Sequence, residues 1–273
     1  MEGKSFGCIP SPVDVRDYKI NAGSITTSLP EEFELDFKHR IKDQGMINSC
    51  VAHATSSILE YHSGMKNVLS TNFIYGIQHQ ECDHDEPGMY LRDACKIVNK
   101  YGDMLDKDCP GNDEVPRSWS IAEKALKDAE KSLAAAKYKI RSYYSCRTPN
   151  DIKYALFNYG PVLICIKWHE KYDINEGNVI TFNQTTDFGY HAIMIYGWTQ
   201  EGFLCQNSWG KRFGKDGCFV LPYSYPIAEA KALIDLEDVE DEALVVPNKS
   251  KNELIDVFLK MFNFILNIFS KKS

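Results

Sequence analysis

QGMINSCVAHA, residues 44–54, is the stretch that decides the fold, because it places a cysteine at the start of a helix. Gly45 predicts a turn, Ser49 is a favourable N-cap, and apolar residues at helical spacing follow Cys50. Unpaired backbone N–H groups and the helix dipole lower the pKa of a thiol in the first turn, which favours a thiolate nucleophile. We expect the side-chain amide of Gln44 and the backbone N–H of Cys50 to bind an oxyanion together.

A histidine and an asparagine stand far downstream in two further distinctive contexts. His191 lies in the apolar run GYHAIMIYGW (189–198), and Asn207 lies in QNSWG (206–210). They follow Cys50 by 141 and 157 residues, which is the long cysteine–histidine–asparagine spacing of one class of thiol enzyme. Taken singly, these residues have simpler interpretations as an inert thiol, a satisfied core histidine and a turn residue. Their occurrence together, and with Gln44, favours a catalytic set.

On these residues the chain resembles the papain-like (cathepsin-type) cysteine peptidases over about residues 29–222, as a microbial or viral member with a short N-terminal leader. The resemblance implies that Cys50 is the nucleophile and His191 the acid and base. It also implies that Asn207 orients His191 and that Gln44 belongs to the oxyanion hole. The implied fold is α+β with two lobes: a helical lobe carrying the nucleophile helix, an antiparallel barrel-like β lobe, and a catalytic cleft between them.

The same resemblance implies four substrate-binding positions. Relatives carry a Gly-Gly pair whose backbone binds the substrate chain, and here Gly88 is followed by Met89. Tyr190 replaces a small residue beside the histidine, so we expect it to narrow the S1 side of the cleft. Trp209 resembles the family tryptophan that shields the histidine–asparagine hydrogen bond from water. The implied reaction is peptide hydrolysis through an acyl-enzyme, with no cofactor and no metal.

Hydrophobic periodicity divides the matching region into a helical lobe at about 29–142 and a β lobe at about 143–222. Helices are expected at 50–61, 70–80, 90–101 and 150–157, together with one long surface helix at 119–138. Strands are expected at 161–168, 179–182, 191–198, 202–206 and 217–221.

Both ends of the chain lie outside this region. We expect the leader, residues 1–28, to pack on the outside of the domain, and the alternative is a strand that lies in the cleft as a plug. Residues 223–251 read as an acidic linker, and 252–273 as an amphipathic helix with a wide apolar face. We expect that helix to dock on the protein or a second copy; a membrane interface and a partner protein are the alternatives.

Composition and charge limit the partners. The 273-residue chain has a net charge of −7 and no basic run beyond its last lysines, which argues for peptide or protein substrates and against nucleic acid. His79, Cys82 and His84 lie close together in the sequence, but their spacing fits no standard zinc site, so we expect a hydrated acidic loop.

The cysteines predict the compartment. There are nine of them, an odd number, with no Cys-x-x-Cys pair, and Cys165 and Cys205 are expected to be free core thiols. Ile47 stands where secreted relatives carry a disulfide cysteine, and residues 1–7 lack the apolar core of a signal peptide. We therefore expect a reducing, intracellular setting, either the cytoplasm of a microbe or the product of a viral gene.

Two other functions fit the same residues. A papain-like fold can be a catalytically silent binding protein, although such relatives usually lack the cysteine or the histidine, and this chain has both. The same triad could also transfer its acyl group to an amine, as in a peptide ligase.

Overall fold

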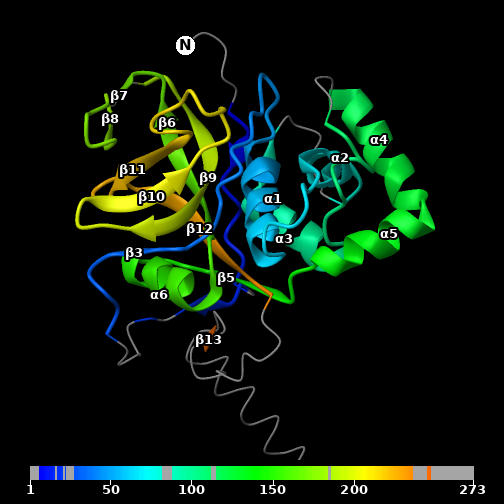
Figure 1. The fold of residues 1–273 in the computed structure, drawn as a ribbon, viewed down its shortest axis with the longest axis horizontal. Helices are drawn as coiled ribbons and strands as arrows, with labels where there is room; N and C mark the ends of the chain where they lie inside the picture. Colours follow the sequence, from blue (N-terminus) through cyan, green and yellow to red (C-terminus); the bar gives the residue numbers. More distant parts are fainter. Residues whose placement is uncertain are drawn as a thin grey trace, which may run out of the picture.

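A computed structural model describes residues 6–15, 17–20, 22, 28–81, 88–111, 115–183, 186–235 and 245–246. Figure 1 shows helices on one side of the molecule, the large sheet on the other, and the N-terminal segment between them. The helices are α1 (Cys50–His62), α2 (Thr71–Glu81), α3 (Leu91–Lys100), α4 (Val115–Lys127), α5 (Ala129–Ala135) and α6 (Pro149–Tyr159). The strands are β1 (Cys8–Ile9), β2 (Lys19–Ile20), β3 (Phe33–Glu34), β4 (Met89–Tyr90), β5 (Ser142–Ser145), β6 (Val162–His169), β7 (Tyr172–Ile174), β8 (Ile180–Phe182), β9 (Phe188–Trp198), β10 (Gly202–Gln206), β11 (Cys218–Pro222), β12 (Ile227–Ile234) and β13 (Val245–Val246).

Helix α1 is the centre of the helical lobe. Its residues from Cys50 to Glu60 are all buried, because α2 and α3 cover one side of the helix and β9 and β6 cover the other. A helix that is enclosed in this way is fixed in position by packing on every face. The expected helices at 50–61, 70–80, 90–101 and 150–157 are confirmed within two residues at each end.

The expected single helix at 119–138 is wrong. Helix α4 begins earlier, at Val115, and ends at Lys127; a separate helix, α5, follows, and a 3-10 turn completes the segment. The break occurs at Asp128, whose backbone is extended and whose side chain accepts hydrogen bonds from the N–H groups of Glu130 and Lys131. An aspartate that caps a new helix in this way stops the preceding helix from continuing.

The β lobe is a mostly antiparallel sheet with the strand order β11-β10-β9-β6-β12-β5-β2-β13, in which β3 also pairs with β9. The long strand β9 lies between β10 and β6, and its register on β6 places His191 opposite Ile166 and Ala192 opposite Cys165. All five expected strands are confirmed within three residues. The α+β fold with a helical lobe and a β lobe is therefore confirmed.

Strand β12 extends the β lobe beyond its expected end. It pairs antiparallel with both β6 and β5, and the residues from Ala230 to Ile234 are buried. The linker expected at 223–251 is therefore wrong for 227–234. The structure does not describe 236–244 or the helix expected at 252–273, so that helix stays a prediction. Within the described residues, no helix is both long enough and apolar enough to cross a bilayer.

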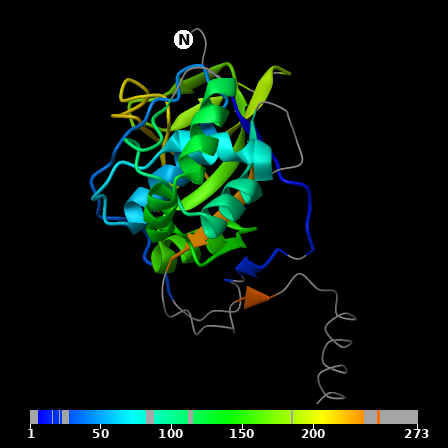
Figure 2. The same ribbon diagram turned by 90° about the vertical axis from the view of Figure 1, so that its right-hand side faces the viewer.

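The N-terminal segment is built into both lobes, so the expectation that it packs on the outside is wrong. Figures 1 and 2 show it descending between the lobes along one face of the molecule. Strand β1 pairs in parallel with β4, and β2 pairs with β5 and β13. Cys8 and Ile20 are buried in the core. These short strands satisfy backbone groups of both lobes, which a segment on the outside would not do.

A buried ion cluster fixes the loop that leads into α1. Glu60 is fully buried, and its carboxylate lies 2.9 Å from Arg40 and 3.0 Å from Lys42. The same carboxylate accepts a hydrogen bond from the Leu69 N–H. Because a buried carboxylate needs such partners, the chain just before Gln44 is held against the nucleophile helix.

Ile58→Ala tests the packing of α1. Ile58 is fully buried, so we expect the substitution to lower the free energy of unfolding by about 2–5 kcal/mol, measured by urea denaturation. Val68 is 46% exposed, and Val68→Ala should change the same quantity by less than about 0.5 kcal/mol. Equal effects of the two substitutions would contradict the central position of α1.

Candidate active site

Cys50 lies at the boundary between the two lobes. It opens α1, and its sulfur accepts a hydrogen bond from the Ala192 N–H, at 3.4 Å, so the residue after His191 touches the thiol. Ser49 precedes the helix as expected, but its side chain makes no cap hydrogen bond; its hydroxyl lies 3.2 Å from the His53 ring instead. The start of α1 and the middle of β9 therefore meet at the sulfur.

The hydrogen bond between His191 and Asn207 determines the tautomer of the histidine. His191 Nε2 lies 2.8 Å from Asn207 Oδ1, and the same oxygen accepts the Ser208 N–H at 2.8 Å. Because that atom accepts from a backbone amide, it must be the oxygen, and Nε2 must carry the proton. In the neutral ring Nδ1 is then an acceptor. It is buried and has no hydrogen-bond partner among the described residues.

Two tryptophans enclose this pair. Trp209 stacks on His191, with 4.6 Å between ring centroids and 30° between the ring planes. Trp168, on β6, lies edge-on to both rings, at 4.7 Å from Trp209 and 5.2 Å from His191. The expected shielding by Trp209 agrees with this geometry. Sequence reasoning did not single out Trp168, which stands in an apolar strand with nothing local to mark it.

Gln44 is tied to the residue that follows Asn207. Its Nε2 donates to the Ile47 carbonyl at 3.0 Å, and its Oε1 accepts the Ser208 hydroxyl at 2.7 Å. The Gln44 N–H also donates to the Ser208 carbonyl, at 2.9 Å. Ser208 therefore connects the loop before α1 to the asparagine, a role that the motif did not predict.

The chain's own residues Phe6–Ile9, which we call the cleft segment, cover this site. A Cβ on Gly7 would lie 2.0 Å from the Asn48 carbonyl oxygen, and one on Gly189 would lie 2.3 Å from the Phe6 ring. The Phe6 ring centroid is 6.3 Å from those of both His191 and Trp209. As a result, Cys50 and His191 are both 0% exposed. The expected alternative, a plug in the cleft, is the observed arrangement.

The cleft segment also occupies the backbone of two residues expected to bind substrate. The Met89 N–H donates to the Gly7 carbonyl at 2.8 Å, and Cys8 lies opposite Met89 in the parallel pair. Gly88 packs against the same stretch of the leader. Tyr190 is half-buried on β9, with its ring 5.8 Å from that of Phe188. That Gly88, Met89, Tyr190 and Trp209 bind substrate stays a prediction.

Burial changes the charge states expected at the site. It raises the pKa of the Cys50 thiol to about 12, although hydrogen bonds from the N–H groups of Ala192, Gly7 and Val51 oppose that rise. Burial likewise lowers the pKa of His191 to about 4, against the effect of its hydrogen bond to Asn207. In the covered site, burial therefore favours the neutral thiol and the neutral imidazole over their charged forms.

Thiols and metal-ligating groups are the remaining candidates for chemistry. Cys165 and Cys205 are free and buried, as expected. No group of three or more His, Cys, Asp or Glu residues suited to a metal occurs in the part of the chain that the structure describes. Residues 82–87, which include Cys82 and His84, and the side chain of His79 lie outside the described part.

Comparison with known protein families decides to which family the chain belongs. The profile of the papain family cysteine proteases matches residues 29–228. The chain belongs to the papain family. It is 24% identical over 233 residues to an uncharacterised peptidase C1-like protein of Acanthamoeba polyphaga mimivirus, covering 78% of this chain and 73% of that protein. It is also 24% identical to the viral cathepsin of Adoxophyes honmai nucleopolyhedrovirus, covering 77% of this chain but only 59% of the relative.

Solved structures agree with the family. Xylellain, a cysteine protease from Xylella fastidiosa, superposes with a TM-score of 0.70 at 25% identity, covering 85% of this chain and 96% of that one. Procathepsin B S9 from Trypanosoma congolense gives 0.64 at 16% identity, covering 85% and 87%, and shows the shared fold. The resemblance found in the sequence to a papain-like cysteine peptidase of microbial or viral type is confirmed.

Gly189→Ala tests whether the packing of the Phe6 ring against Gly189 keeps Cys50 covered. The added methyl group would lie 2.3 Å from the Phe6 ring, so the cleft segment must shift and expose the sulfur. We expect alkylation of Cys50 by iodoacetamide to become about tenfold faster or more, which corresponds to a weakening of the closed form by about 1.4 kcal/mol. Gly177→Ala, in an exposed turn, should leave the rate unchanged. An unaltered rate in Gly189→Ala would show that Phe6 does not control access.

Acid should destabilise the covered fold through three histidines, of which His53 and His191 are buried and His62 is half-buried. Burial lowers the pKa of His53, His62 and His191 to about 4 each, so the unfolded chain takes up protons first as the pH falls below 6.5. Each histidine should therefore cost about 3 kcal/mol of stability by pH 4. Urea denaturation from pH 7.5 to pH 4 measures this loss. In His62→Gln the dependence on pH should become less steep; an unchanged slope would exclude His62 as a source.

Proposed function

We propose that this chain is a cysteine endopeptidase, in which Cys50 attacks internal peptide bonds and His191 transfers the proton. The observation that carries the proposal is the orientation of the imidazole. Asn207 and Ser208 hold Nε2–H, so that Nδ1 is the ring nitrogen left to accept the thiol proton. The N–H of the next residue, Ala192, touches the Cys50 sulfur, which places the histidine backbone at the nucleophile.

Acylation then follows from these positions. His191 Nδ1 takes the proton of the Cys50 thiol, and the sulfur attacks the carbonyl carbon of the substrate. The carbonyl oxygen becomes an oxyanion, for which the proposed donors are the Cys50 N–H and the side-chain amide of Gln44. The C–N bond breaks as Nδ1–H returns its proton to the leaving amine. Asn207 keeps the ring in one plane throughout, because its oxygen is held from two sides.

Deacylation uses the same groups in reverse. Water attacks the thioester while Nδ1 takes its proton, and the carboxylic acid product leaves with the Cys50 thiol restored. The ring of Trp209 over His191 limits the access of water to the Nε2–Asn207 hydrogen bond. Catalysis requires the cleft segment to move away first, because it covers both reacting side chains. The protein as described is thus a latent peptidase.

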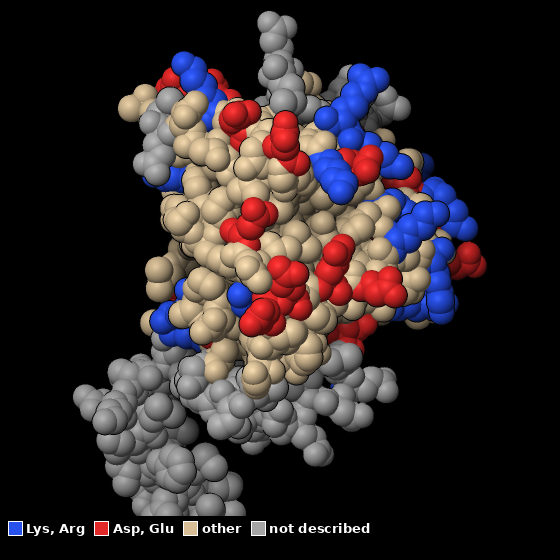
Figure 3. Space-filling view, turned by 60° about the vertical axis from the view of Figure 1, so that its left-hand side comes forward, with Lys and Arg blue, Asp and Glu red and all other residues tan. Residues whose placement is uncertain are grey.

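We propose peptides or proteins as substrates, and no nucleic acid partner. The net charge is −7, and Figure 3 shows acidic side chains in the middle of one face of the molecule with Lys and Arg toward its edges. Nucleic acid binding needs clustered cations. The free thiols of the described residues support a reducing compartment, such as the cytoplasm of a microbe or of a virus-infected cell.

Alkylation with a peptidyl epoxide at pH 6–7 tests the proposal, with peptide mapping to locate the adduct. We expect one adduct, on Cys50, in the wild type and in Cys218→Ser, which removes a partly exposed thiol elsewhere on the β lobe. We expect none in His191→Ala, because the thiol then lacks its base. Hydrolysis of a peptide library should likewise require both Cys50 and His191. If Cys50 were labelled to the same extent in His191→Ala as in the wild type, the result would contradict activation of the Cys50 thiol by His191.

The same assays separate the alternatives. Mass spectrometry of the products distinguishes hydrolysis, which adds one water, from ligation, in which an added amine replaces the leaving group. A Cys50 adduct without turnover of any peptide would point to the silent binding protein.

A further inference from the structure

The N-terminal segment is held at two places by different kinds of interaction. In the cleft, Phe6–Ile9 is held by main-chain hydrogen bonds, such as that from Met89 to Gly7, and by contact of the Phe6 ring with β9. No ion pair joins these four residues to the rest of the described chain. Their attachment therefore consists of main-chain hydrogen bonds and apolar contacts, including the burial of Cys8, and such contacts are also open to a peptide substrate or inhibitor.

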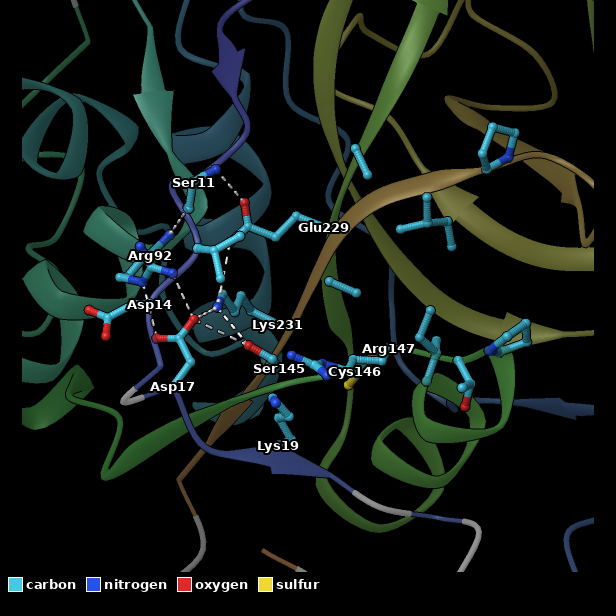
Figure 4. Close-up of a pocket in the computed structure, with 18 of the residues that line it drawn as sticks. Ser11, Asp14, Asp17, Lys19, Arg92, Ser145, Cys146, Arg147, Glu229 and Lys231 are labelled. Carbon is cyan, nitrogen blue, oxygen red and sulfur yellow. Dashed lines mark hydrogen bonds and ion pairs between the residues drawn. The ribbon is translucent and has the colours of Figure 1, made fainter. Parts of the chain in front are cut away.

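A second stretch, Ser11–Ile20, which we call the anchor segment, is held by charge. Asp17 receives two hydrogen bonds from Arg92, at 3.1 and 2.8 Å, and one from Lys231 Nζ at 2.7 Å. Figure 4 shows Asp17 between these two cations, on the wall of a cavity between the lobes. The Lys231 side chain is 2% exposed and that of Arg92 10% exposed, so neither cation has bulk water as an alternative partner.

Hydrogen bonds along its length join the anchor segment to both lobes. The Ser11 N–H donates to Glu229 at 2.8 Å, and the Ser11 hydroxyl accepts the Arg92 N–H at 3.3 Å. At the other end, the Ser145 N–H donates to the Tyr18 carbonyl at 2.8 Å, and Ile20 is buried in the core. The anchor segment is therefore bonded to α3, β5 and β12.

Removal of the anchor would leave Arg92 without the carboxylate of Asp17, and would leave Lys231 with only Ser145, at 2.7 Å, and Glu229, at 3.5 Å. A buried cation that loses its carboxylate is strongly unfavourable, whereas broken main-chain hydrogen bonds in an open cleft are replaced by water. Burial alone would raise the pKa of Asp17, but the hydrogen bonds from Arg92 and Lys231 outweigh it and lower that pKa. The carboxylate thus stays charged in mild acid, and the anchor does not depend on neutral pH.

We propose that the N-terminal segment is a tethered gate: Phe6–Ile9 leave the cleft while Asp17 keeps Ser11–Ile20 attached to Arg92 and Lys231. The boundary lies at Pro10, which has no N–H and follows the last residue of β1. Opening is then local and reversible, and it needs no cut in the chain. A gate that stays attached competes with substrate at a fixed effective concentration, so the degree of opening does not depend on protein concentration.

Hydrogen exchange of the full chain tests this gate, because two amides report on its two parts. The Met89 N–H is bonded to the cleft segment and the Ser145 N–H to the anchor segment. The cleft is filled by covalent reaction of Cys50 with a bulky peptidyl epoxide, and exchange is followed by mass spectrometry in peptides containing each amide. The test needs only alkylation of Cys50, so it stands apart from whether the chain hydrolyses peptides.

In the labelled wild type we expect the amides of residues 6–9 to exchange at least about tenfold faster, while the peptide containing Ser145 keeps its protection. The exchange rate of the peptide containing Met89 should also change, because the epoxide takes the place of Gly7 beside the Met89 N–H. In labelled Asp17→Asn the Ser145 peptide should also lose at least about tenfold in protection. Glu32→Gln removes one negative charge from an exposed position outside both segments, and should behave like the wild type.

Loss of protection at Ser145 in the labelled wild type would overturn the proposal, because the whole segment would then leave as one unit. So would unchanged exchange of residues 6–9 in the protein labelled on Cys50, since the cleft segment would then not have left the cleft. Unchanged protection in labelled Asp17→Asn would remove Asp17 as the tether. If that variant does not fold, the wild-type comparison alone still decides between local and complete release.

Discussion

The contact between the first residue of α1 and the middle of β9 is the interaction on which the rest of the structure depends. The Cys50 sulfur accepts the N–H of Ala192, and this one hydrogen bond joins the helical lobe to the sheet at the reacting atom. The other side chains of the site are positioned relative to this contact. The register of β9 on β6 sets the height of His191, and the loop through Ser208 ties Asn207 to Gln44. Two separate lobes thus act as one rigid site.

Exclusion of water serves this site in two opposite ways. Around the His191–Asn207 pair, the tryptophans keep water from a hydrogen bond that must hold through the reaction. Over Cys50, the cleft segment excludes water so thoroughly that the thiol and the imidazole are both held neutral, with their pKa values moved apart by burial. In the proposed mechanism, solvent and substrate replace Phe6–Ile9 before Cys50 and His191 react. The cleft segment would then hold back the reaction through desolvation as well as through steric obstruction.

The candidate site residues could be found in the sequence because each carries its signal in its neighbours, as Cys50 does in its turn and helix start; their catalytic roles stay a prediction. The two-lobed α+β fold followed from periodicity and from the family resemblance. Features that depend on distant contacts could not be predicted. Lys231 lies in β12, beyond the end of the family resemblance found in the sequence, and its counter-ion Asp17 is 214 residues away. No sequence feature near Trp168 indicates its position at the site, and the residues around Asp128 are strong helix formers that do not indicate a break.

The close approach of Gly7 to the Asn48 carbonyl has a consequence for the evolution of the chain. The backbone there leaves no space for even a methyl group, so only glycine fits at position 7 when the segment lies in the cleft. Nineteen of the twenty amino acids at position 7 conflict with that contact. The covered arrangement of the cleft therefore depends on a residue that contributes no side chain at all.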